Sequence, residues 1–184
     1  METKVKLLNA YLVDAPLLFI QKRSKPICGV SEMVFGNMPN DRGYFSLGED
    51  DRKKIIKENP ELIKTIRPFL GAEEFINNIP RYCIWLNDVS PVIYKNSKEI
   101  MNRIENVRNA RLTSDREATR KLADFPALFG EIRQPDTNYL LIPRVSSERR
   151  KYIPIGFLTK DVIAGDSTLI IPNATLYEFG ILTS

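Results

Sequence analysis

Apolar residues recur with a period of two in some segments of the chain and near 3.6 in others, which predicts a mixture of strands and helices. In the first part of the chain, short apolar runs bounded by turn-forming residues predict strands joined by loops. These runs occupy residues 5–8, 17–20, 33–35 and 44–47. Branched and aromatic residues predict four later strands. These strands are expected over residues 81–86, 139–142, 152–157 and 167–171.

The segments that predict helices lie mainly in the middle of the chain. Residues 49–58 are rich in charged side chains and predict a solvated short helix, and residues 61–66 predict another helical turn. Apolar side chains three or four residues apart predict a longer helix over residues 97–111. The Ser-x-x-Glu sequence that begins at Ser114 has the form of a capping box and predicts a helix over residues 114–124.

The order of these elements predicts a mixed α/β (α+β) fold with a mixed or antiparallel sheet, flanking helices and long loops. The 184 residues contain no internal repeat, low-complexity run or Gly/Ser-rich linker, so one domain over residues 1–184 is expected. Residues 1–47 are expected to form a lead-in of strands and loops, and residues 48–184 the main body.

Composition excludes several classes of chemistry. The chain has no histidine and only two cysteines, Cys28 and Cys83, which excludes Ser-His-Asp and Cys-His triads and leaves too few ligands for a structural zinc site. Both cysteines are expected to be reduced thiols in the core. No apolar run reaches the roughly 18 residues of a membrane span and no signal-peptide pattern is present, so a cytoplasmic protein without a membrane partner is expected.

Basic charge gathers in two windows of the chain. The net charge is +4 and the isoelectric point is about 9.0. Residues 98–121 contain seven Lys or Arg against four Asp or Glu, and residues 131–160 contain six against three. Because these windows together hold more positive charge than the whole chain, a fold that joins them would create an anion-binding surface.

Several phrases spread over nearly the whole chain are similar to those of one protein family. They are Gly71-Ala72-Glu73-Glu74-Phe75, Arg81-Tyr82-Cys83-Ile84-Trp85-Leu86, Arg120-Lys121-Leu122-Ala123, Arg133-Gln134-Pro135-Asp136, Ile142-Pro143-Arg144-Val145-Ser146-Ser147-Glu148 with Tyr152-Ile153-Pro154, and Ile171-Pro172-Asn173-Ala174-Thr175-Leu176-Tyr177. By these phrases the chain resembles the MmeI-like class I, SAM-dependent DNA methyltransferases, many of which fuse methylation and cleavage in one polypeptide. The matching stretch of that family is its target-recognition domain.

The resemblance implies a sequence-specific module whose partners are double-stranded DNA and the methyltransferase core of the same polypeptide. It also implies that the chain is a fragment of an adenine-type DNA methyltransferase or a fused restriction–modification enzyme. SAM, and Mg²⁺ where the parent also cleaves DNA, would belong to that parent. The chain lacks the Gly-rich turn that holds SAM and the Asn/Asp-Pro-Pro-aromatic turn that grips a flipped base, so no catalytic residue, cofactor or metal is expected in it.

The first candidate for DNA contact is the turn expected over residues 146–151, together with Arg144 just before it. Its candidate residues are Arg144, Ser146, Glu148, Arg149, Arg150 and Lys151. If side chains alternate there, Glu148 and Arg150 would face base edges, where Glu accepts from cytosine and Arg donates to guanine. Arg149 and Lys151 would then face phosphate or solvent. The alternative is a charged hairpin tip that lies in water.

The second candidate is the helix predicted after Ser114, which would offer Arg116, Arg120 and Lys121 to DNA phosphates. Acidic residues in its first turn would repel a phosphate, and the alternative is a capped helix whose basic residues are only solvated.

A third candidate is the loop that carries Arg133 and Gln134, which also has the composition of an ordinary turn. Arg103 and Arg108 are expected on a solvated helix face, and Trp85 is expected in the core. For the chain as a whole, the alternative function is a protein-interaction or structural domain whose basic surface is only solubilising. Such a domain would have no affinity for DNA even at low salt.

Overall fold

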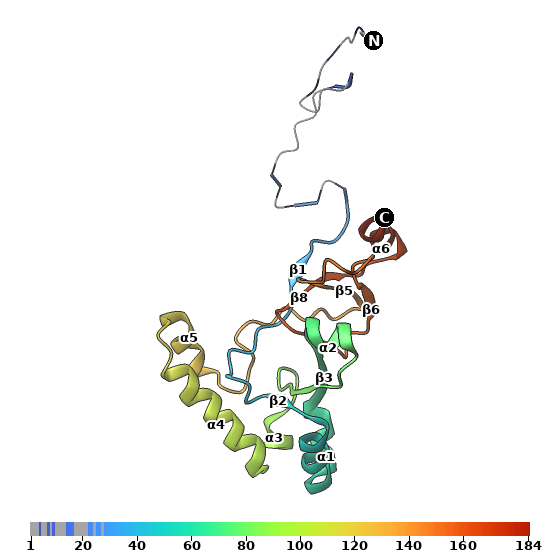
Figure 1. Cartoon of the computed structure of the whole chain (residues 1–184). Coiled ribbons are helices and arrows are strands. Elements are labelled where there is room, and N and C mark those ends of the chain that lie inside the picture. Colours follow the sequence, from blue (N-terminus) through green and yellow to red (C-terminus); the bar gives the residue numbers. More distant parts are fainter. Residues whose placement is uncertain are drawn as a thin grey trace.

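The computed structural model describes residues 28–184 together with residues 4, 7, 9, 14–16, 22, 23, 25 and 26. Two four-stranded sheets carry the fold, and helices cover the second of them (Figure 1). This arrangement confirms the predicted mixed α/β class. The strand predicted at residues 17–20 and, apart from residue 7, the strand predicted at residues 5–8 lie outside the described residues.

The first sheet is antiparallel throughout. Its strands follow the order β1 (Val34–Phe35), β8 (Thr168–Pro172), β5 (Tyr139–Pro143) and β6 (Gly156–Leu158). Every residue of β5 is buried because the sheet is covered on both faces. Alternation along β5 places Tyr139 and Leu141 in one apolar cluster and Leu140 and Ile142 in another, which the last helix of the chain completes.

The second sheet is mixed. Its order is β2 (Ser46–Leu47), β4 (Tyr82–Ile84), β3 (Ile66–Leu70) and β7 (Ile163–Ala164), with only β3 and β7 parallel. The two sheets meet where Gly165 N–H donates to Leu70 O (2.9 Å) and Asn37 N–H donates to Ala164 O (2.7 Å). Backbone bonds of this kind fix residues 34–38 across the junction of the sheets.

Most helices pack beside the second sheet or extend from it, and the last one packs on the first sheet (Figure 1). They are α1 (Glu49–Glu58), the 3-10 helix η1 (Pro60–Thr65), α2 (Ala72–Asn77), α3 (Pro91–Tyr94), α4 (Lys98–Leu112), α5 (Glu117–Lys121), the 3-10 helix η2 (Leu122–Asp124) and α6 (Leu176–Thr183). The apolar stripe of α4 enters the main core, which also contains Trp85 as predicted. Among the described residues, no helix is long and apolar enough to cross a membrane.

Two predictions of local structure are wrong, and a third element is confirmed with its end shifted by one residue. Ser114 does not cap a helix, because its Oγ accepts from Arg116 N (3.3 Å) and closes a turn, so that α5 begins only at Glu117. The strand predicted from residue 152 begins at Gly156. The helical turn predicted to end at Ile66 ends at Thr65, and Ile66 starts β3.

The two cysteines are both free, but they differ in environment. Cys83 lies in the core as predicted, and burial raises the pKa of its thiol far above the usual value. Cys28 is exposed, so the prediction that it is a core thiol is wrong. Cys28 belongs to none of the three apolar clusters of buried residues.

Candidate nucleic-acid interface

A buried arginine holds together segments that border some of the candidate residues. Arg111 continues the apolar stripe of α4, and only 1% of it is exposed. All five of its N–H groups donate to main-chain carbonyls. Nε donates to Asn40 O (3.0 Å), Nη1 to Leu122 O and Phe125 O (2.9 and 3.0 Å), and Nη2 to Pro39 O and Leu128 O (2.9 and 2.7 Å). One side chain therefore ties residues 39–40 and 122–128 to α4.

Burial lowers the pKa of the Arg111 guanidinium from its usual value, and the neighbouring Asp41 carboxylate opposes this shift. Asp41 is itself buried and accepts from Gly43 N (3.0 Å) and Phe45 N (2.6 Å). The two charges offset each other inside the protein. Although Arg111 belongs to the first basic window, it adds no charge to the surface.

Asn37 and Gln134 form an internal amide pair at the junction of the two sheets. Gln134 Oε1 accepts from Asn37 Nδ2 (2.9 Å) and Ala164 N (3.2 Å), and its Nε2 donates to Lys160 O (3.1 Å) and Val162 O (2.8 Å). Because an amide has two donor and two acceptor positions, these bonds leave Gln134 no free group for a base edge. Its place in the fold argues against the predicted base-reading role.

Arg133 and Arg144 converge on the ring of Phe35, which is 47% exposed. The guanidinium carbon of Arg144 lies 4.8 Å from the ring centroid and that of Arg133 lies 6.0 Å from it. Arg133 also pairs with Glu131 and donates to Gly36 O (3.0 Å). The side chain of Arg144 donates one hydrogen bond, to Asp166 O (3.0 Å), and has no ion-pair partner within the described part of the chain. Arg144 is thus oriented by its neighbours and keeps N–H groups for a ligand.

The predicted contact turn follows Arg144 and connects β5 to β6. Ser147 organises it, since its Oγ accepts from Arg149 N (3.2 Å) and its carbonyl accepts from Arg150 N (3.0 Å). The segment is a turn and not extended chain, so the alternation of side chains assumed for Glu148 and Arg150 does not apply.

The side chains of this turn differ in their freedom to bind a partner. Glu148, Arg149 and Arg150 are exposed, and no side-chain partner binds them among the described residues. Lys151 lies over the Tyr152 ring, with Nζ 5.3 Å from its centroid. Ser146 has its Oγ buried without a hydrogen-bond partner in the described part of the chain, so it does not face a base edge in this conformation.

The residues of the second candidate lie at the far end of α4, on and beside α5 (Figure 1). Arg116 is exposed, and its guanidinium has no partner among the described residues. Arg120 donates to Ser114 O (2.8 Å), and Lys121 pairs with Glu117 (2.9 Å) in full exposure to solvent. Exposed pairs of this kind are weak and exchange readily for a phosphate.

Arg103 does not lie on a solvated face, contrary to the prediction. It pairs with Glu99 (2.7 Å) and Asp51 (3.8 Å), and it donates to Tyr44 O (2.9 Å). Arg108, on the same helix, is exposed as predicted.

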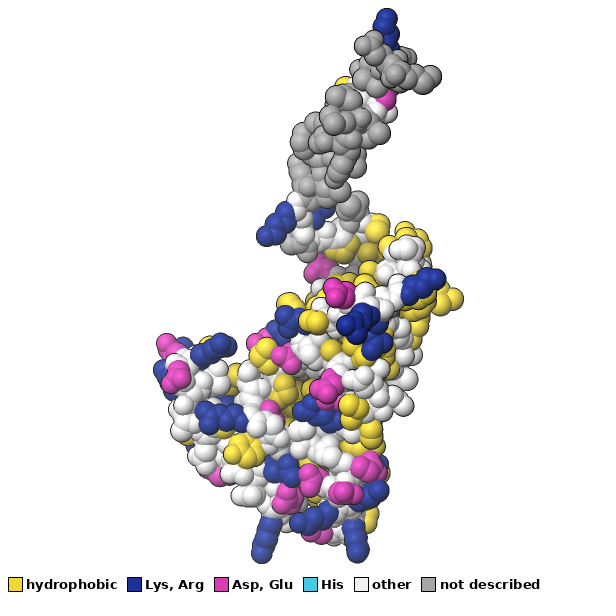
Figure 2. Space-filling view, viewed as in Figure 1, with side chains coloured by type: hydrophobic (Ala, Val, Ile, Leu, Met, Phe, Trp, Pro, Cys, Tyr) yellow, Lys and Arg dark blue, Asp and Glu magenta, His cyan; other side chains and the backbone are white. Residues whose placement is uncertain are grey.

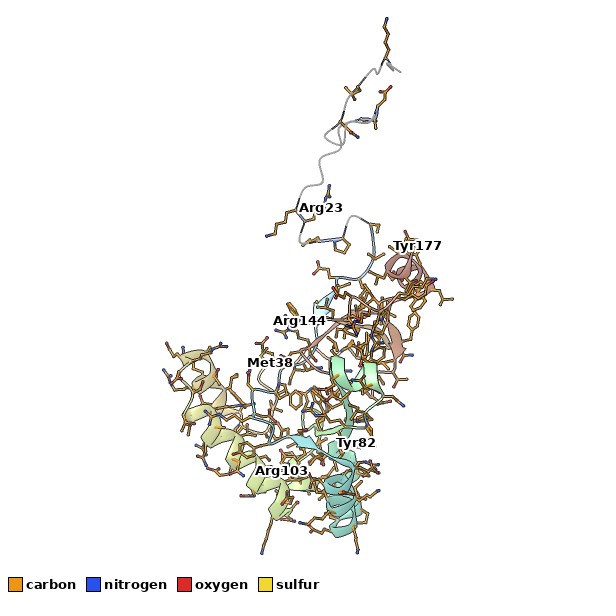
Figure 3. All side chains as sticks on the ribbon, in the orientation of Figure 1. Arg23, Met38, Tyr82, Arg103, Arg144 and Tyr177 are labelled. Atoms are coloured by element: carbon orange, nitrogen blue, oxygen red, sulfur yellow. The ribbon has the colours of Figure 1, made fainter. Side chains whose placement is uncertain are left out.

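The fold brings the two basic windows to one hollow surface, which we call the concave face and define by Phe35, Met38, Arg116, Glu131 and Arg144. Met38 and Glu131 exchange backbone hydrogen bonds (2.9 and 3.0 Å) between the two ends of this face. A pocket of about 290 Å³ is lined by Met38 and Glu131 on one side and Arg116 on the other. Figure 3 shows Arg144 and Met38 along the side of the molecule that faces α5. No group of Cys, Asp and Glu side chains in the described ranges could hold a metal ion.

Sequence reasoning missed three residues of this region. Phe35 was interpreted only as part of a strand, and nothing in its short apolar run distinguishes an exposed ring from a buried one. Arg42, which lines a cleft together with Arg116, lies in a segment whose composition indicates only a turn. Arg111 did carry a signal, because it continues the spacing of Ile100, Ile104 and Val107 and must therefore point into the protein.

Comparison with known proteins agrees with this geometry. The family described as "MmeI, target recognition domain" matches residues 14–184. DNA methyltransferase A of Bacillus subtilis (strain 168) is 36% identical over 185 residues, which cover 100% of this chain and 21% of that protein. The solved structure of the type IIL restriction-modification enzyme MmeI in complex with DNA superposes with a TM-score of 0.86 at 40% identity, covering 99% of this chain and 24% of that chain.

The chain therefore spans about a fifth to a quarter of the length of these two relatives. The family match covers most of the chain, including both sheets and every residue of the concave face. On this evidence the chain belongs to the MmeI target recognition domain family.

Proposed function

We propose that this chain is a sequence-specific recognition module for double-stranded DNA. The observation that carries the proposal is the concave face, which carries Arg116 from one basic window and Arg144 from the other, each with unpaired N–H groups. Arginines that are not paired with an Asp or Glu of the same protein are the usual contacts of proteins to phosphates and to guanine. The relative of known structure was solved with DNA bound, which supports the same partner here.

We assign base reading to the end of the concave face that lies on the first sheet. Arg144 is held against Phe35 and so loses little conformational freedom on binding, which suits a contact to the O6 and N7 atoms of guanine. The exposed Glu148 and Arg150 in the next turn supply an acceptor and a donor for neighbouring bases. Arg116, Arg120, Lys121, Arg149 and Lys151 serve phosphates, and Arg133 orients the Phe35 ring.

The module works within a longer DNA methyltransferase or restriction–modification protein, which we expect to be adenine-specific and cytoplasmic. SAM, and Mg²⁺ for a parent that cleaves DNA, bind to other parts of that protein. Exposed apolar side chains on and near α6 support a further contact surface, with Leu176 79% and Ile181 60% exposed. Figure 2 shows apolar side chains gathered at this end of the molecule. We assign this surface to the methyltransferase core, and residues 1–184 to one recognition domain.

Substitution of the turn residues is expected to change which sequence the parent enzyme modifies. Glu148→Ala or Arg150→Ala removes a hydrogen-bonding partner of one base pair, which costs about 1–3 kcal/mol of discrimination against the wrong base. Methylation-site sequencing should then show relaxed preference at one position of the motif. Lys121→Ala, as the matched phosphate variant, should weaken activity on all sites alike.

An unchanged motif at normal activity in both turn variants would contradict the base-reading assignment. Tight binding of SAM to the isolated chain, measured by isothermal titration, would contradict the assignment of catalysis to the rest of the parent. If the chain is only a structural or protein-interaction domain, it will not bind duplex DNA even at low salt.

A further inference from the structure

Arg42 occupies a backbone conformation that arginine rarely adopts. Its φ is 51°, in the left-handed region, and it lies beside Gly43 with a φ of 86°. A residue with a Cβ atom costs about 1 kcal/mol there relative to glycine. The side chain of Arg42 is exposed and has no hydrogen-bond or ion-pair partner among the described residues, so no internal contact offsets this cost.

The loop that carries Arg42 is nevertheless held rigidly. On one side Arg111 binds the carbonyls of Pro39 and Asn40, at 2.9 and 3.0 Å. On the other side the Asp41 carboxylate accepts from two backbone N–H groups, at 3.0 and 2.6 Å. The conformation of Arg42 is therefore imposed by its neighbours on both sides. Backbone strain that neighbouring residues impose, and that no contact within the protein offsets, is typical of binding sites.

Arg42 and Arg116 line the same cleft. This cleft, of about 320 Å³, lies between the loop and the start of α5 and is also lined by Asn40, Ser114 and Thr119. Neither guanidinium is paired with an acid in the described part of the chain. Asp41 borders the cleft, but Arg111 offsets its charge and backbone N–H groups occupy its oxygens. Asp115 and Glu117 are the nearby acids that oppose an anion; neither lines the cleft, and Glu117 pairs with Lys121.

We propose that Arg42 and Arg116 bind one phosphodiester group of the DNA backbone in this cleft. The inference rests on the proposed function and adds a site to it. Two planar guanidiniums can each donate paired N–H groups to phosphate oxygens, and Thr119, a further lining residue of the cleft, carries a hydroxyl group. This contact positions the duplex along the concave face, while Arg144 and the turn after it read the bases.

The test is DNA binding by the 184-residue chain as a function of salt, on duplexes of several sequences. Arg42→Gly removes the guanidinium and also relieves the left-handed conformation, so its thermal midpoint should not fall. The Arg42→Gly/Arg116→Ala variant should bind every duplex about tenfold more weakly, and the slope of log Kd against log salt should fall by about 1, as expected for the loss of one phosphate contact. Its order of preference among sequences should not change.

The matched control is Lys54→Ala/Lys57→Ala, which removes two exposed charges from α1, near the end of α4 that is farther from α5 (Figure 1). It should leave the salt slope within about half a unit of that of the unsubstituted chain. If the cleft variant binds as the control does, the phosphate site is wrong while the proposed function stands. If the unsubstituted chain does not bind any duplex at low salt, the proposed function fails and this site fails with it.

Discussion

Replacing Arg111 with methionine is expected to lower the free energy of unfolding by about 4 kcal/mol or more. Methionine fills much of the same volume but removes five hydrogen bonds to main-chain carbonyls. Pro39 O, Leu122 O and Phe125 O keep a backbone donor, whereas Asn40 O and Leu128 O lose the donor that binds them. Each buried acceptor that loses its partner costs about 1–3 kcal/mol, and the losses are less than additive where water can enter. The loop at residues 39–40 and the segment at 122–128 should separate from α4.

Urea denaturation followed by circular dichroism measures this effect. Arg108→Met is the matched control, because Arg108 lies on the exposed side of the same helix, and it should change the free energy by about 0.5 kcal/mol or less. Arg111→Lys keeps a charge but has only three donors, so its loss should lie between the two. A loss below about 1 kcal/mol for Arg111→Met would contradict the role assigned to this side chain.

Replacing Gly36 with alanine is expected to destabilise the junction of the two sheets by about 3 kcal/mol. A Cβ atom at this position would lie 2.2 Å from Gly165 O and 2.7 Å from Gly165 C. Both are backbone atoms, so β1 must move away from the segment between β7 and β8. The shift would displace Phe35 and the Arg144 guanidinium that stacks on it, and DNA affinity should fall together with stability.

Gly29→Ala is the control for this substitution, since a Cβ atom at Gly29 meets nothing within 4 Å. It should leave both the thermal midpoint and DNA binding unchanged. A Gly36→Ala variant with the stability of the Gly29→Ala variant would show that β1 is free to move at the junction, and would remove the basis for a rigid Phe35 platform.

Local patterns in the sequence predict the elements whose own residues determine them. The charged run of α1 and the apolar stripe of α4 are such cases, as is the continuous apolar run of β5, and all three form where expected. Elements that depend on distant partners are missed. β7 is a two-residue strand that exists because it pairs with β3, about a hundred residues earlier in the chain.

The same contrast between local and distant determinants applies to the candidate site. Sequence reasoning finds the exposed basic residues Arg116, Arg144 and Arg150, because charge and turn composition are local properties. It gives Gln134 a role on the surface although the fold uses all its hydrogen-bonding groups internally, at contacts 26 to 97 residues away. It cannot show that Phe35 lies under two guanidiniums, since β1, residue 133 and residue 144 meet only in the folded chain.

The most direct test of the central claim is selection of duplexes from a random-sequence library by the 184-residue chain at low salt, followed by sequencing of the retained DNA. A module that reads bases through Arg144 and the turn after it should enrich one short motif, and the enrichment should change at one position in the Glu148→Ala variant. Retention of no DNA, or of a pool whose composition matches the starting library, would contradict sequence-specific recognition by this chain.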